Sequence, residues 1–172
     1  MSRLIPLGLC LWLLSACVSR PDNVQPVHDF QLQRYLGTWY EIARLDHRFE
    51  RGMQAVTARY SLREDGGVDV INRGYIPAKS RWKQAHGKAY FVEDSQQGFL
   101  KVSFFGPFYG AYVIFELDQQ DYQYAFVSGS DTDYLWLLAR SPQPEPEVIT
   151  RFIQQARLRG FNTDELIFVE HD

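Results

Sequence analysis

The chain has 172 residues, with 18 Lys and Arg against 21 Asp and Glu and a formal net charge of −3. This length suits one domain with a single core, and no basic cluster supports the binding of nucleic acid. Four Trp, ten Tyr and twelve Phe make an aromatic content typical of a β-rich core or an apolar cavity.

The first apolar run lies at the N-terminus, from Leu4 to Leu14, after a positive start at Arg3. It is shorter than the roughly 20 residues that a membrane-spanning helix needs and has the length of a signal-peptide core. The residues from Leu14 to Cys17 resemble the end of a bacterial lipoprotein signal, in which small residues precede an acylated cysteine. We therefore expect residues 1–16 to be removed and Cys17 to carry acyl chains. An ordinary secretory signal with an incidental cysteine is the alternative.

Cysteine usage and the next residues extend this expectation. Cys10 lies in the segment expected to be removed, so Cys17 is the only cysteine of the expected mature chain. An intrachain disulfide is thereby excluded. Val18, rather than Asp, follows the cysteine, and the resemblance to bacterial lipoproteins implies that such a residue favours release from the inner membrane, so we expect an anchor in the outer membrane, facing the periplasm. Residues 17–27 are mostly polar with two prolines, so we expect a lipidated tether before a domain over residues 28–172.

Eight short strand-like runs follow, separated by turn residues such as Gly, Pro and Asp. Their spacing of about 8–12 residues is typical of an antiparallel sandwich or barrel. The approximate runs are Thr38–Leu45, Ala55–Leu62, Val68–Tyr75, Trp82–Val92, Phe99–Phe105, Tyr109–Asp118, Tyr122–Ser128 and Tyr134–Arg140.

The periodicity changes after Pro142. Val148, Phe152 and Leu158 recur at helical spacing, which predicts one amphipathic helix from about Glu145 to Arg159. Gly160 follows as a natural stop, and Leu166–Val169 reads as a last short strand. A single helix after eight strands must dock its apolar face on the outside of the sheet.

Three short motifs carry a family resemblance. The segment from Gly37 to Arg44, with Gly37 and Trp39, resembles the first signature of the lipocalins. The residues Thr132, Asp133 and Tyr134 resemble the second signature of that family, and Arg140 resembles the third. The resemblance covers about Val27 to Val169 and implies an all-β fold: an eight-stranded antiparallel up-and-down barrel with one C-terminal α-helix packed outside.

The resemblance also assigns a role to the signature residues. In this family the arginine packs over the tryptophan at the closed end of the barrel, which here places Arg140 over Trp39. Such a cation–π contact contributes about 0.5–2 kcal/mol. We therefore interpret both residues as structural rather than ligand-binding, and Gly37 as a site of close approach or unusual backbone angles.

A barrel of eight strands encloses room for side chains or one small ligand. Alternation along the first strand places Trp39, Glu41 and Ala43 inward, and small residues such as Ala85 and Ala89 leave space. The inward face is mostly apolar, as a lipid-tail pocket requires, although ordinary core filling is the alternative at each position. From family parity, the expected ligand-binding residues are Trp136, Tyr112, Phe104, Tyr60, Tyr134, Leu138, Val102 and Asn72.

Polar and aromatic residues are expected at the mouth of the barrel. Arg44, Arg51 and Lys79 are candidates for a phosphate or carboxylate head group, since cations suit such anions. The aromatic tip from Phe105 to Tyr109 suits contact with a membrane or a second subunit, so a homodimer through the open end stays an open alternative.

Metal, cofactor and catalytic motifs are not found in the sequence. The four histidines lie far apart and in no ligand spacing, and no nucleophile or phosphate-loop motif is present. Glu41 and Glu116 could form an inward carboxylate pair, with solvated or Arg-paired side chains as the alternative. We expect neither catalytic residues, nor a metal, nor a cofactor.

Together these features predict an outer-membrane lipoprotein that binds or carries fatty acids or lysophospholipids for envelope maintenance or stress. Two alternatives stay open. The first is a lipid-modifying or isomerising enzyme that uses the same cavity. The second is a structural or partner-binding envelope lipoprotein with a filled barrel.

Overall fold

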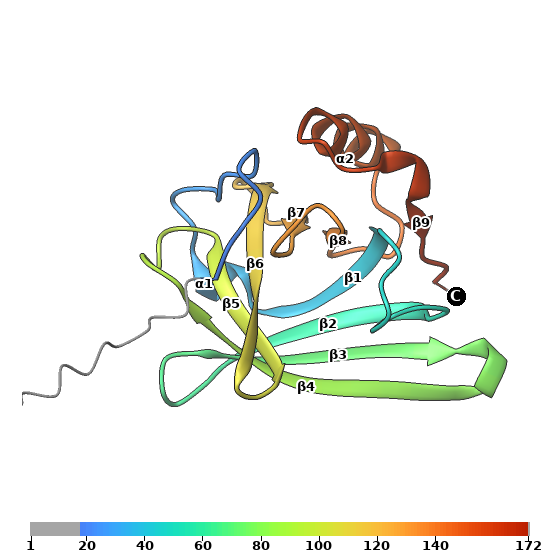
Figure 1. The fold of residues 1–172 in the computed structure, drawn as a ribbon, viewed down its shortest axis with the longest axis horizontal. Coiled ribbons are helices and arrows are strands. Elements are labelled where there is room, and N and C mark those ends of the chain that lie inside the picture. Colours follow the sequence, from blue (N-terminus) through green and yellow to red (C-terminus); the bar gives the residue numbers. More distant parts are fainter. Residues whose placement is uncertain (1–17, 172) are drawn as a thin grey trace, which may run out of the picture.

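A closed β-barrel forms the body of the protein in the computed structural model, which describes residues 18–171. Successive strands pair antiparallel from β2 to β8, and β1 pairs with both β8 and β2, which closes the barrel (Figure 1). The predicted fold class is therefore confirmed. The strands are β1 (Gly37–Arg44), β2 (Gln54–Leu62), β3 (Val68–Ile76), β4 (Arg81–Phe91), β5 (Phe99–Phe105), β6 (Phe108–Leu117), β7 (Tyr124–Ser128) and β8 (Leu135–Ala139).

Shorter elements complete the fold. A last strand, β9 (Ile167–Phe168), extends the sheet beside β1. Three short helices accompany the strands: α1 (Leu32–Tyr35) before β1, η1 (Pro77–Lys79) between β3 and β4, and η2 (Thr163–Glu165) shortly before β9. Leu32 and Tyr35 of α1 are buried in the barrel core. Within residues 18–171, no helix has the length and apolarity needed to cross a bilayer.

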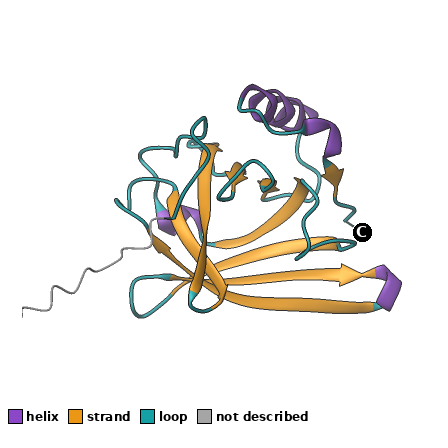
Figure 2. Ribbon diagram, in the orientation of Figure 1, coloured by secondary structure: helices purple, strands orange, loops and turns teal. Residues whose placement is uncertain are grey.

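The one long helix of the described chain, α2 (Pro146–Leu158), lies outside the barrel, as predicted (Figure 2). Pro146 stands in its first turn, and Gly160, with φ of +83°, follows its end. Phe152 and Ala156 are its buried residues, and the Phe152 ring meets Phe126 of β7 at a centroid distance of 5.1 Å. The apolar stripe of the helix thus docks on the outer face of the sheet.

Two apolar clusters result from this arrangement. One fills the closed part of the barrel and includes Trp39, Ile114 and Val127. The other lies between the barrel and α2 and includes Leu137 and Phe152. Because successive strand residues point to opposite faces, β8 contributes Leu138 to the first cluster and Leu137 to the second.

Strand β1 departs from simple alternation after Glu41. The pairing with β8 shifts there, so that Glu41 pairs with Leu138 and Ala43 with Leu137. Ala43 was expected inward, which is wrong: it belongs to the cluster beneath α2. The extra residue of a β-bulge reverses the faces beyond it, and Arg44 therefore takes an inward position beside Trp136.

The packed domain begins before residue 28, which was expected to be its first residue. Val24 is 0% exposed and belongs to the cluster beneath α2. The backbone N–H of Val27 donates to Ile114 at 2.9 Å, and Gly98 donates to the carbonyl of Val27 at 2.9 Å. Of the expected tether, residues 24–27 are thus part of the packed domain, while Cys17 lies outside the described residues.

Candidate functional site

The closed end of the barrel is sealed by Arg140 and Trp39. The Arg140 guanidinium carbon lies 3.9 Å from the centroid of the Trp39 rings. Its terminal nitrogens donate to the carbonyls of Thr38 at 2.8 Å and Leu36 at 2.9 Å. Gly37 between them has φ of +98°, and a Cβ there would lie 3.3 Å from the Arg140 guanidinium. This end is therefore packed and holds no free space for a ligand.

A cavity occupies the rest of the barrel interior. Its empty space measures about 800 Å³, including the part open to solvent. Its lining residues come from β1 to β6 and β8, from α1 and the residue run before it, and from the loop after β1: Phe30, Leu32, Tyr35, Glu41, Glu50, Val56, Thr57, Ala58, Tyr60, Val68, Val70, Asn72, Ala89, Leu100, Val102, Phe104, Ala111, Tyr112, Trp136 and Leu138.

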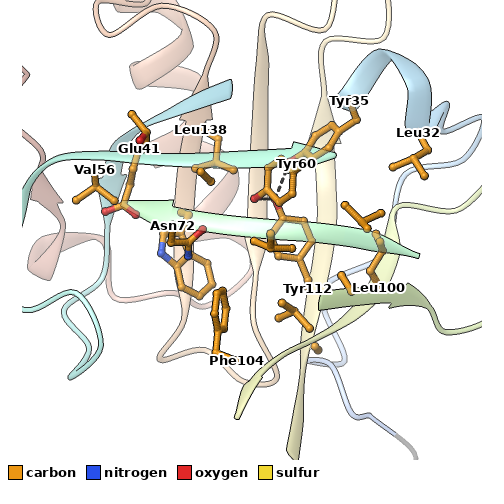
Figure 3. A pocket seen from close by; sticks show the side chains of 18 of the residues that line it. Leu32, Tyr35, Glu41, Val56, Tyr60, Asn72, Leu100, Phe104, Tyr112 and Leu138 are labelled. Atoms are coloured by element: carbon orange, nitrogen blue, oxygen red, sulfur yellow. Dashed lines mark hydrogen bonds between the residues drawn. The ribbon is translucent and has the colours of Figure 1, made fainter. Parts of the chain in front are cut away.

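The two ends of this cavity differ in chemistry. Figure 3 shows Glu41 and Asn72 on one side of it and Leu32 and Leu100 on the other. The side chains of three tyrosines lie between the two ends. The cavity therefore has an apolar end next to α1 and a polar end where β1 leads into the loop before β2.

Tyr35, Tyr60 and Tyr112 form a hydroxyl network in the middle of the cavity. The Tyr112 hydroxyl lies 2.7 Å from that of Tyr35 and 2.8 Å from that of Tyr60. Burial raises the pKa of all three phenols above the ordinary value, because the charged form loses its hydration. The three hydroxyls are therefore neutral and satisfy one another.

Arg44 organises the polar end. Its side chain is 1% exposed and donates to Glu41 Oε1 at 2.7 Å. Its other terminal nitrogen donates to the carbonyls of Glu50 at 2.9 Å and Met53 at 3.3 Å. These contacts fasten the loop between β1 and β2 to the strand, because a buried guanidinium needs several acceptors.

Glu50 reaches from that loop into the same cluster. Its Oε2 accepts from Trp136 Nε1 at 3.1 Å and lies 2.9 Å from His47 Nε2. Burial acts to raise the pKa of Glu50, but the hydrogen bonds from His47 and Trp136 outweigh it and the pKa is lowered. Burial, and then the Glu50 charge, raise the pKa of Glu41, and Arg44 offsets this only in part.

Most of the expected ligand-binding residues lie on the cavity wall. Tyr134 does not: it stands before the first residue of β8, stacks on Trp136 at 6.1 Å and faces His47 at 5.7 Å. The alternation of inward and outward side chains holds only within a strand. Tyr134 lies before β8, so the alternation did not predict its position correctly. The residues on the wall are Trp136, Tyr112, Phe104, Tyr60, Leu138, Val102 and Asn72.

The three cations that were expected to bind a head group at the mouth of the barrel do not line the cavity. Arg44 is buried and holds Glu41, and Arg51 pairs with Asp46 at 2.8 Å. Lys79 lies exposed in η1. Glu116 does not join Glu41, because it pairs with Arg151 of α2 on the outer face. Within residues 18–171 no group of three His, Cys, Asp or Glu side chains could hold a metal ion.

Sequence reasoning missed lining residues that lie outside the strands. Phe30, Leu32 and Tyr35 come from α1 and the residue run before it, and Glu50 comes from a loop. These residues lie outside the strands, so no repeating pattern of apolar residues predicts where their side chains point. An acidic residue between the aromatic Phe49 and the basic Arg51 reads as a solvated loop residue, although here it is buried.

Comparison with known proteins agrees with this architecture. The profile of the lipocalin-like domain matches residues 30–171. The chain is 58% identical over 168 residues to a protein of Vibrio cholerae serotype O1 named outer membrane lipoprotein Blc, covering 98% of each chain. It is 50% identical over 173 residues to the protein of the same name from Escherichia coli K12, covering 98% of this chain and 97% of that one.

More distant proteins share the fold. Apolipoprotein D of Rattus norvegicus is 34% identical over 143 residues, covering 80% of this chain and 72% of that one. The solved structure of insecticyanin from the tobacco hornworm Manduca sexta superimposes with a TM-score of 0.70 at 21% identity, covering 90% of this chain and 87% of that one. The barrel, its signature residues and the matches over nearly the whole chain together show that this protein belongs to the lipocalin family.

Proposed function

We propose that this protein is an outer-membrane lipoprotein that binds or carries lipids, as fatty acids or lysophospholipids, for envelope maintenance or stress. The observation that carries the proposal is the cavity, which is apolar next to Leu32 and Leu100 and polar next to Glu41 and Asn72. An amphiphile has the same two ends. Burying an alkyl chain gains about 0.8 kcal/mol per CH₂, which suffices for micromolar affinity after the costs of association.

Anchoring through acyl chains on Cys17 is part of this proposal. The relatives from Vibrio cholerae and Escherichia coli are named outer membrane lipoproteins, and two or more acyl chains give stable anchoring where one is marginal. Residues 18–23 separate Cys17 from the buried Val24, so the two lie at most about 25 Å apart when this segment is fully extended. The barrel would therefore stay close to the periplasmic surface of the membrane.

The cavity disfavours the alternative of a purely structural lipoprotein with a filled barrel. Small residues, Ala58 and Ala89, stand on the wall between larger ones and keep the space open. The enzyme alternative would use Glu41 or Glu50 as acid or base, but both are engaged by neighbouring side chains in one closed cluster. We therefore assign no catalytic residue.

Uptake of a fluorescent fatty acid tests the proposal. A chain that begins at Val18 keeps every contact described above, and we expect it to bind the probe saturably, with one probe per barrel. Ala89→Phe fills the cavity, while Ala78→Phe, in the exposed η1 turn, adds the same group outside it. Ala89→Phe should weaken binding by about tenfold or more, and Ala78→Phe should not change it.

Two results would count against the carrier. A folded wild-type barrel without saturable uptake would favour the structural alternative. A probe recovered in chemically altered form would favour the enzyme.

A further inference from the structure

Two large aromatic side chains stand exposed at the tip of the β5–β6 hairpin. Phe105 is 69% exposed and Phe108 is 77% exposed, and the two residues pair across the turn. Single exposed apolar residues are common on soluble domains, whereas adjacent ones mark contact with a partner or a membrane. The pair at this tip therefore points to a surface that covers it.

This tip belongs to the open end of the barrel. The β1–β2, β3–β4, β5–β6 and β7–β8 connections share one end of an antiparallel up-and-down barrel, and Arg140 seals the other. Figure 1 shows the β5–β6 turn and α2 on opposite sides of the molecule. The neighbouring β3–β4 hairpin adds Trp82, which is 48% exposed and lies 3.7 Å from the guanidinium carbon of Arg73. Two adjacent hairpins thus bring aromatic side chains to this end.

The β3–β4 hairpin also concentrates positive charge. Between Val70 and Val92 the chain has five Lys or Arg residues and no Asp or Glu, although the net charge of the whole chain is −3. All five cations are exposed, and none forms an ion pair with a carboxylate of residues 18–171. Cations beside exposed aromatic residues are complementary to anionic phospholipid head groups. The five cations are Arg73, Lys79, Arg81, Lys83 and Lys88.

The β7–β8 connection at the same end has the opposite charge, with Asp131 and Asp133 exposed. An anionic bilayer would repel this connection and attract the β3–β4 hairpin, so the barrel would meet the bilayer with its β3–β6 side. A second copy of this chain fits the same surface less well. A symmetric dimer brings the same patch of both copies together, and two basic hairpins would then repel each other.

The proposed anchor leaves the domain beside the same two strands. Val18, which directly follows Cys17, packs against the outer cluster to which Phe99 of β5 and Ala111 of β6 belong. Figure 1 shows the first described residues, in dark blue, beside β5 and β6. Ala111 and Phe108 stand about 10 Å apart along β6, at about 3.3 Å per residue. A bilayer that holds acyl chains at Cys17 is therefore within reach of the aromatic tip.

We propose that the tips of the β3–β4 and β5–β6 hairpins dock on an anionic phospholipid bilayer. Phe105 and Phe108 enter the interfacial layer, and the exposed cations of the β3–β4 hairpin contact lipid phosphates. The mouth of the cavity then opens at the membrane, so that a lipid can pass between the bilayer and the cavity without crossing water. This contact goes beyond the proposed function, because it depends neither on Cys17 nor on the ligand in the cavity.

Co-sedimentation of the chain from Val18 with vesicles tests the contact in the absence of acyl chains. The vesicles consist of phosphatidylcholine alone, or of equal parts of phosphatidylcholine and phosphatidylglycerol. We expect the protein to bind the anionic vesicles at low salt and to bind the zwitterionic vesicles weakly. Binding to the anionic vesicles should fall as salt is added, because salt screens the attraction between the cations and the lipid surface.

Phe105→Ser combined with Phe108→Ser should weaken binding to the anionic vesicles by about tenfold or more, since it removes two apolar side chains from the interface. Leu158→Ser is the matched control, because Leu158 of α2 is also 77% exposed, and it should leave binding unchanged. Arg81→Gln should weaken binding by about fivefold at low salt. Arg157→Gln, which removes an exposed charge from α2, should change it much less.

Ala89→Phe separates docking from uptake of vesicle lipid into the cavity. It fills the cavity but leaves the hairpin tips intact, so we expect it to bind the anionic vesicles as tightly as wild type. A loss of binding in this folded variant would assign the vesicle contact to the cavity and overturn the inference. Uptake of fatty acid by the wild type is measured separately, so a failure of docking leaves the proposed function standing.

Two further results would overturn the docking surface. The first is folded wild-type protein that does not bind the anionic vesicles, or that binds them as well after the Phe105→Ser and Phe108→Ser changes as after Leu158→Ser. The second is a wild-type dimer in analytical ultracentrifugation that these two changes convert to a monomer. That result would assign the aromatic tip to a second copy of the chain.

Discussion

Arg140 lies over Trp39 at the closed end of the barrel, with its guanidinium carbon 3.9 Å from the centroid of the indole rings. The same side chain donates to three carbonyls of the segment from Arg34 to Thr38. It thereby joins the end of β8 to the start of β1 and to α1. The contact closes one end, so a ligand can enter only from the other.

Arg140→Ala should lower the free energy of unfolding by about 2–4 kcal/mol, because it removes a cation–π contact and several charge-assisted hydrogen bonds. Arg140→Lys should lose less, since it keeps the charge but not the planar fork. Urea denaturation followed by tryptophan fluorescence gives the values. Arg81→Ala, an exposed change, should stay within about 0.5 kcal/mol of wild type. A loss at Arg140 no larger than that of this control would contradict the sealing role.

Tyr112→Phe should destabilise the protein by about 1–3 kcal/mol, because it leaves the buried hydroxyls of Tyr35 and Tyr60 without their partner. The triple change of these tyrosines to Phe removes all three hydroxyls together. Its loss should therefore be smaller than the sum of the three single losses. Thermal or urea unfolding of the four variants measures this, and strict additivity would refute the mutual network.

Trp136→Ala should reduce the affinity for a fluorescent fatty acid by about tenfold, since it removes apolar wall and the donor that orients Glu50. Trp82→Ala is the matched control, because Trp82 is 48% exposed and lies outside the cavity. Fluorescence titration of both folded variants gives the comparison. An unchanged affinity for Trp136→Ala would remove this residue from the ligand site.

The raised pKa of Glu41 makes stability depend on pH. A carboxyl with a folded-state pKa above its unfolded value stabilises the fold when protonated, and this contribution is lost as pH rises through the folded-state pKa. Glu41→Gln should therefore flatten the decline in stability that sets in as the pH rises above about 4.3, the ordinary pKa of Glu. The urea midpoints of wild type and Glu41→Gln, measured at a series of pH values with Glu93→Gln as control, give the pH dependence of stability. Equal slopes for wild type and Glu41→Gln would show that Glu41 is not the titrating group.

Cys17→Ala should release the protein from the membrane fraction into a soluble one, because the acyl chains supply the anchoring in this account. Fractionation and immunodetection of cells that express either form give the result. Recovery of the variant in the membrane fraction would show that another part of the chain holds it there.

Local pattern and family signatures predicted the barrel well. Alternation with turn residues located β1 to β8, and the spacing of Val148 and Phe152 located α2, because each element buries a face with a regular period. The contact between Arg140 and Trp39 followed from the family resemblance. These features repeat over many residues or depend on short signature motifs, so a single chain suffices to reveal them.

The polar end of the cavity could not be predicted in the same way. The β-bulge after Glu41 moves Ala43 outward and Arg44 inward, and no residue type in this strand marks the extra position. Glu50 contacts His47 of its own loop, Arg44 at the end of β1 and Trp136 of the distant strand β8, and its burial depends on the packing of this loop against β8. Long-range packing of this kind leaves no periodic trace in the sequence.

The lipid that accompanies the barrel when it is purified tests the proposed lipid site most directly. A chain that begins at Val18, produced in bacteria and isolated without detergent, would be measured by native mass spectrometry beside its Ala89→Phe variant. We expect one intact monoacyl lipid per wild-type barrel and little or none in the folded variant. A wild-type barrel free of lipid that also takes up no added monoacyl lipid, or equal lipid in both proteins, would contradict a lipid site in this cavity.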